Sequence, residues 1–126
     1  MMIQVIELYK IRFYKDRQGK QPVLEYLKSL LSRGDKDSRI KANKIQDYIE
    51  VLKRFGLSAG LPYVKHLDGK IYELRPLKDR IIFAAWTGGE FILLSHFTKT
   101  TQKTPRSEIE TAKKRLADIL EREIDD

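Results

Sequence analysis

Residues 80–97 constrain the fold of this chain more than any other segment. After Arg80, the next six side chains are apolar, which is typical of a strand in the middle of a sheet. Thr87-Gly88-Gly89 then favours a tight hairpin turn, and residues 90–97 form a second, largely apolar run. The segment therefore predicts two neighbouring antiparallel strands.

Two further strands are expected from the pattern of apolar side chains. Residues 70–75 alternate polar and apolar side chains, which predicts a strand that Pro76 ends. Residues 3–14 are rich in β-branched and aromatic side chains, and residues 7–13 partly alternate, so a strand is expected near the N-terminus as well.

Helix signals lie on either side of these strands. Pro22 can open a helix, because the N–H that proline lacks would have no partner there, and Gly34 suits the position after its end. Leucines at helical spacing place this helix at about 21–33. Asp35 or Asp37 can cap a second helix with an apolar stripe, which Gly56 ends.

A last helix is expected near the C-terminus, with Thr104 as its cap and Pro105 at its first position. The order is then strand, helix, helix, three strands, helix. Residues 1–126 thus indicate a single α+β domain, with an antiparallel meander and two N-terminal helices packed as a hairpin on one face of the sheet.

Composition excludes several classes of function. The chain has no cysteine, which excludes disulfides, thiolate metal ligands and cysteine nucleophiles. No apolar run approaches the roughly 20 residues of a membrane helix, and the N-terminus lacks a signal-peptide pattern, so we expect a cytoplasmic protein. The net charge of +7 favours a polyanionic partner such as nucleic acid, although excess charge also serves solubility alone.

The clearest candidate site lies at the end of the 70–75 strand. Period two places Glu73 and Arg75 on one face, which is expected to be open, and Arg80 follows across a short turn. Two neighbouring guanidiniums repel each other unless an anion lies between them, and either Glu73 or an RNA phosphate suits that place. The alternative is a surface pairing of Glu73 with Arg75, or of Asp79 with Arg80, that contributes little.

The end of the 90–97 strand adds further candidates. His96 is a possible acid or base, since the unperturbed pKa of histidine lies near neutrality, and His66 is a second one; either can instead be a hydrogen-bonded structural residue. Lys99 and Lys103 lie in a basic loop that can close over a ligand. Phe97 can stack on a base.

Several other chemistries find no support. The sequence contains no Gly-rich phosphate loop, no HExxH or paired His/Asp metal motif and no Gly-x-Ser-x-Gly elbow, so neither a metal nor a cofactor is expected. A nuclease without a metal has to use the RNA 2′-hydroxyl as its nucleophile. That reaction needs a base, cations for the phosphorane charge and an acid for the 5′-oxygen. The side chains that can supply these roles are Lys65, His66, Glu73, Arg75, Arg80, His96 and Lys99.

Four segments form a recognisable set: Lys65-His66-Leu67-Asp68-Gly69-Lys70-Ile71-Tyr72-Glu73-Leu74-Arg75, Arg80-Ile81-Ile82-Phe83, Leu93-Leu94-Ser95-His96-Phe97-Thr98-Lys99 and Gln102-Lys103-Thr104-Pro105. Together they resemble the HigB branch of the RelE/ParE toxin superfamily, including its phage-derived relatives. The resemblance covers about residues 8–120 and is strongest over 61–116.

The resemblance implies a curved antiparallel sheet of about four or five strands with helices packed on one side. It also implies an mRNA endonuclease that acts in the ribosomal A site. Such a toxin is encoded beside a HigA-like helix-turn-helix antitoxin, which neutralises it and, together with it, represses the operon at the operator DNA. ParE-type members share the fold and poison DNA gyrase instead. A phage module that binds nucleic acid without catalysis is a third possibility.

By position in the superfamily, Arg75, Arg80 and Lys99 match the phosphate-contacting residues best, followed by Lys65 and Lys103. Glu73 is either a base or the ion-pair partner that holds Arg75. The expected catalytic set is Arg75, Arg80, Lys99, Glu73 and His96. The expected RNA-binding set is Lys65, His66, Lys70, Phe97 and Lys103.

Overall fold

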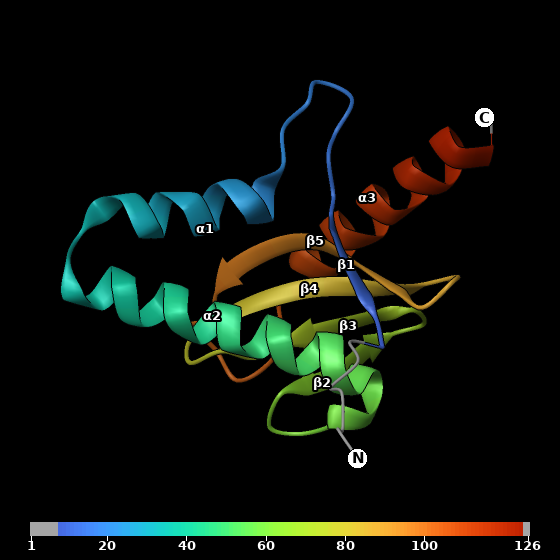
Figure 1. Ribbon diagram of the computed structural model, residues 1–126. Coiled ribbons are helices and arrows are strands. Elements are labelled where there is room, and N and C mark those ends of the chain that lie inside the picture. The colour runs from blue at the N-terminus through green and yellow to red at the C-terminus, as the bar shows by residue number, and fades with distance from the viewer. Residues whose placement is uncertain (1–7, 125–126) are drawn as a thin grey trace, which may run out of the picture.

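Five strands form one open sheet, in the order β1-β5-β4-β3-β2, in the computed structural model, which describes residues 8–124 (Figure 1). The elements are β1 (Lys10–Phe13), α1 (Pro22–Arg33), α2 (Lys36–Phe55), the 3-10 helix η1 (Gly56–Ala59), β2 (Val64–Asp68), β3 (Ile71–Leu74), β4 (Asp79–Trp86), β5 (Glu90–Thr98) and α3 (Arg106–Ile124). The part of the expected N-terminal strand that falls on residues 3–7 lies outside the described residues. None of the helices in the described segment is long and apolar enough to cross a membrane.

The α+β class and the number of strands are confirmed, but the sheet is mixed rather than wholly antiparallel. β1 pairs with β5 in parallel, while the other neighbouring strands are antiparallel. Parallel partners need a long connection, and here α1, α2 and three strands lie between them in the sequence. The pattern of apolar residues sets which face of β1 is buried, and it carries no information on the direction of its partner.

The helix pair forms as the sequence indicates. Gly34 adopts the left-handed conformation that ends α1, and the Asp35 carboxylate accepts a hydrogen bond from the Ser38 backbone N–H at 2.9 Å, which caps α2. Gly56 ends α2 at a place where a side chain does not fit, because a Cβ there would lie 2.6 Å from the Tyr9 ring. The two helices cover one face of the sheet (Figure 1).

α3 covers the opposite face, so the expectation of helices on one side of the sheet is wrong. Along β4, Ile81 and Phe83 pack towards α1 and α2, whereas Ile82 and Ala84 pack towards α3. A strand that is apolar on both faces needs cover on both faces. The core under α3 contains Tyr14, Ile71, Ile82, Ala84, Ile92, Leu94, Ala112 and Ile119.

β2 is an edge strand that the period-two pattern did not predict. Its pairing with β3 slips between His66 and Asp68, which interrupts the alternation around Leu67. Charged and polar side chains occupy its exposed positions, as is common for edge strands.

A bulge in the β4–β5 ladder decides which side chains reach which face. Ile82 pairs with Ser95, but the next residue, Phe83, pairs with Leu93, so β5 carries one extra residue there. Because of this insertion, His96 points to the α1 side and Phe97 to the α3 side. A regular ladder would place each on the other face.

Candidate functional site

Four cationic side chains gather on the α3 face of the sheet, around the end of β3. Arg75 directly follows β3, Arg80 begins β4 and Lys99 directly follows β5. Lys65 on β2 is paired with Glu73, and directly paired residues point to the same face. The charges of Arg80, Arg75 and Lys65 all act on Lys99. We call these four residues the cationic cluster.

Glu73 lies at the centre of the cationic cluster and is completely buried. Its Oε2 atom is 3.5 Å from Arg80 Nε and 3.8 Å from Arg75 Nε, and its Oε1 atom accepts a hydrogen bond from the Thr104 hydroxyl. Glu73 is therefore on the expected face, but that face is not open at this position. Thr104, in the loop before α3, contacts Glu73 there.

Arg80 is held tightly by the backbone. Its Nη1 group donates hydrogen bonds to the carbonyl oxygens of Leu77 at 2.7 Å and Asp79 at 2.8 Å. Leu77 has a φ of 56°, the left-handed conformation that non-glycine residues rarely adopt. Burial lowers the pKa of Arg80, and the negative charge of Glu73 acts against that shift. An arginine stays protonated under these conditions, so the site contains a fixed positive charge.

Three polar atoms at this centre are buried without a hydrogen bond: Glu73 Oε2, Arg75 Nε and Arg80 Nε. The separations of 3.5 and 3.8 Å exceed normal hydrogen-bond lengths, so the contacts are electrostatic. Buried polar groups without a hydrogen-bond partner are uncommon in proteins.

Lys99 has a lowered pKa because it is partly desolvated and because Arg80, Arg75 and Lys65 repel its charge, although Glu73 attracts it. Its backbone N–H donates to the Lys78 carbonyl at 2.8 Å, which fixes the start of the loop to the turn before β4. A lysine in this state releases its proton more readily than one in water.

The other expected RNA-binding residues are spread out. Phe97 is paired with Arg80 on the same face and packs against the core under α3. Lys103 is exposed in the loop between β5 and α3. Lys70 is exposed in the turn that precedes β3, at the opposite end of that strand from Arg75.

Both histidines point away from the cationic cluster. The His96 ring stacks on the Tyr26 ring of α1 at a centroid distance of 4.1 Å. Burial lowers the pKa of His96, partly offset by Asp79. His66 is paired with Tyr72 on the α2 side, and its Nε2 atom lies 2.8 Å from the Gly69 carbonyl oxygen.

Sequence reasoning missed two polar groups. Thr104 was expected to cap the last helix, but α3 begins at Arg106, and the Thr104 hydroxyl donates to Glu73 instead. The buried Asp79 accepts hydrogen bonds from Tyr26 at 2.9 Å and Thr98 at 3.2 Å. An aspartate after a proline turn is usually a surface residue, whereas here α1 brings Tyr26 and β5 brings Thr98 to its carboxylate.

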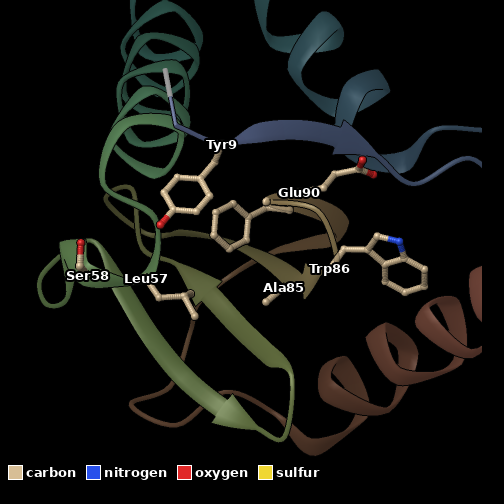
Figure 2. Close-up of a pocket in the computed structure, with 8 residues that line it drawn as sticks. Tyr9, Leu57, Ser58, Ala85, Trp86 and Glu90 are labelled. Atoms are coloured by element: carbon tan, nitrogen blue, oxygen red, sulfur yellow. The ribbon is translucent and has the colours of Figure 1, made fainter. Parts of the chain in front are cut away.

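A separate cavity of about 240 Å³ lies at the other end of the sheet. Figure 2 shows it between η1 and the β4–β5 hairpin, lined by Tyr9, Leu57, Ser58, Ala85, Trp86 and Glu90. Most of its lining is apolar. The Glu90 carboxylate forms an ion pair with Arg12, with 3.3 Å between Oε1 and Nη1. This cavity offers a hydrophobic recess rather than a group of reactive side chains.

The open, five-stranded mixed sheet with three helices is consistent with a RelE-like fold. Residues 31–117 match the model of the family described as phage-derived protein Gp49-like (DUF891). The match spans more than half of the chain, which therefore belongs to this family of RelE/ParE-like toxins. No curated protein matches the chain.

Proposed function

We propose that this protein is the toxin of a type II toxin–antitoxin system and that it cleaves mRNA on the ribosome without a metal ion. The observation that carries the proposal is the cationic cluster, in which Arg75 and Arg80 lie 3.8 and 3.5 Å from a single buried carboxylate. Four cations against one anion leave the site strongly positive. A phosphodiester is the ligand that such a pair of guanidiniums suits best.

The chemistry follows from the groups present. The RNA 2′-hydroxyl attacks the adjacent phosphorus and the bond from phosphorus to the 5′-oxygen breaks. The departing 5′-oxygen takes a proton from water, so the products carry a 2′,3′-cyclic phosphate and a 5′-hydroxyl. Arg75 and Arg80 stabilise the negative charge of the phosphorane. Lys99 accepts the proton of the 2′-hydroxyl, since its pKa is lowered and it lies on the same face. DNA lacks the nucleophile and is not a substrate.

The substrate and partners complete the proposal. Phe97 lies beside Arg80 and stacks on a base next to the cleaved bond. Lys65, Lys70 and Lys103 bind neighbouring phosphates or ribosomal RNA. A HigA-like helix-turn-helix antitoxin neutralises the toxin and brings it to operator DNA. Membership of the Gp49-like family supports this assignment.

The test is expression of the chain from an inducible promoter, with mapping of mRNA 5′ ends and analysis of plasmid supercoiling in the same cells. New 5′ ends within coding regions and unchanged supercoiling are expected. Uncut mRNA with arrested supercoiling would replace the proposal with gyrase inhibition. Uncut mRNA and normal supercoiling, with RNA retained on the purified protein, would instead leave a binding module.

A further inference from the structure

We propose that Glu73 and Thr104 are positioning residues that hold Arg75 and Arg80 around one phosphate, and that Glu73 is not the general base. This inference rests on the proposed function and concerns the same site. In this proposal, the charge of the buried Glu73 carboxylate holds the two arginines in place, and Thr104 contributes to substrate binding.

Burial excludes Glu73 from direct proton transfer. The whole residue is inaccessible to solvent, one carboxylate oxygen accepts from Thr104, and the other faces the two guanidiniums. A general base has to come within hydrogen-bond reach of the proton that it removes. A 2′-hydroxyl cannot reach Glu73 unless the Thr104 loop or an arginine moves away.

The carboxylate has a clear electrostatic task instead. The Nε atoms of Arg75 and Arg80 both lie within 3.8 Å of the same Glu73 oxygen, so the two guanidiniums are close enough to repel each other. The negative charge of Glu73 offsets most of that repulsion. The Nη1 group of Arg80 donates to two backbone carbonyls, and its Nε atom faces Glu73. Within residues 8–124, no hydrogen bond of the Arg80 Nη2 group occurs. The Nη2 group is thus the part of this guanidinium that a phosphate takes.

Thr104 connects this pair to the basic loop. The loop between β5 and α3 is fixed at its start by the bond from Lys99 N–H to the Lys78 carbonyl, and near its end by the bond from Thr104 to Glu73. One hydroxyl therefore sets the position of the carboxylate between the arginines, and also that of the loop that carries Lys99 and Lys103.

The test compares Thr104→Val, which removes the donor at similar volume, with Thr104→Ser, which keeps it. The probe is a 2′-O-methyl RNA oligonucleotide, which can bind but has no nucleophile. We expect Thr104→Val to weaken binding about threefold to tenfold, the range for loss of one hydrogen bond, and Thr104→Ser to bind like the original protein. Equal affinity in all three proteins would overturn the proposal.

Glu73→Gln supplies the second arm, because the amide keeps an acceptor for Thr104 but carries no charge. We expect weaker binding of the 2′-O-methyl RNA, and a rate–pH profile for cleavage that keeps its ascending limb but moves it to lower pH, because the charge of Glu73 no longer raises the pKa of Lys99. Undiminished binding with loss of that limb would show that Glu73 is the base. If Glu73→Gln does not fold, as judged by circular dichroism, the Thr104 pair decides the positioning role, and the rate–pH profile of Lys99→Arg decides whether Lys99 rather than Glu73 is the base.

The two proposals fail in different ways. Absence of cleavage by the original protein would contradict the endonuclease, while the binding arm would still test the positioning role. In that case, inorganic phosphate is the second probe, with the Arg80 Nε–H resonance as readout. A shift with phosphate is expected in all three proteins, with Thr104→Val needing about threefold to tenfold more phosphate for the half-maximal shift than the original protein and Thr104→Ser. No response in any of them would reject the positioning role.

Discussion

The Nε atom of Arg80 lies 3.5 Å from the Oε2 atom of Glu73, and both side chains are buried. The two residues come from adjacent strands and meet on the face that α3 covers. Removal of one member of a buried ion pair leaves the other without compensation, which is costlier than the loss of a surface pair. Substitutions in this pair therefore need separate readouts for folding and for function.

Replacement of Arg80 by alanine should reduce RNA cleavage by about 100-fold or more, because it removes a donor aimed at the developing phosphorane charge. The matched control is Arg39→Ala, which changes the net charge equally at an exposed position on α2. Single-turnover cleavage and growth after induction measure the effect. A folded Arg80→Ala protein with full toxicity would reject the assignment of this residue.

Lys99 should give the cleavage rate a characteristic dependence on pH. Its pKa is lowered from 10.5, so the free amine accumulates at a lower pH than in an ordinary lysine, and the rate should rise with pH and level off below 10.5. Lys99→Arg keeps the positive charge but does not titrate in this range, so its profile should be flat and its rate lower. An unchanged profile in Lys99→Arg would assign the proton transfer to another group.

His96→Phe should leave cleavage within about twofold of the original rate, since the ring stacks on Tyr26 on the side of the sheet away from the cationic cluster. A change of that size lies below the contribution of a true general acid or base, about 100-fold or more. The assay is the same single-turnover measurement. A large loss in a stable variant would restore His96 to the catalytic set.

The same substitution should change how stability depends on pH. Burial lowers the pKa of His96 from 6.5 in the folded state, so the unfolded chain binds a proton first as the pH falls. The folded state should lose stability from about pH 6.5 downwards, until the pH falls below the lowered pKa that His96 has in the folded protein. His96→Phe should show a smaller loss over this interval in urea denaturation; an identical loss would contradict the shift.

Tyr26→Phe should lower the free energy of unfolding by about 1–3 kcal/mol, because it deprives the buried Asp79 carboxylate of a hydrogen bond. Burial and the Asp79 hydrogen bond raise the pKa of Tyr26 to about 12 from 10.0, so this contribution is complete below pH 10 and is lost as the pH approaches 12. Tyr63→Phe serves as the control, since no hydrogen bond of its hydroxyl occurs within the described residues. Equal stabilities would contradict the prediction.

Leu77→Gly should leave stability unchanged or raise the free energy of unfolding by up to about 1 kcal/mol. Leu77 has a φ of 56° and an exposed side chain, so glycine relieves backbone strain at little cost in burial. Leu77→Val should instead destabilise the protein, because a β-branched residue fits this conformation poorly. Chemical denaturation of both variants checks the order; a less stable glycine variant would argue against strain in this turn.

Local signals in the sequence determined the elements and part of the site. Pro22, Gly34, Asp35 and Gly56 set the ends of two helices, because caps and breakers act on their immediate neighbours. The short turn between the end of β3 and Arg80 was enough to bring the two arginines of the cationic cluster together. Alternation within β3 likewise placed Glu73 on the correct face.

Tertiary structure decided the rest. The extra residue of β5 reverses the faces of His96 and Phe97, and no local pattern marks a bulge in a run of apolar residues. The parallel pairing of β1 and the position of α3 depend on contacts between distant segments. Glu73 is buried, and the hydroxyl that donates to it belongs to Thr104, 31 residues further along the chain. The sequence thus determined the charges of this site, and long-range packing decided which of them an RNA phosphate can reach.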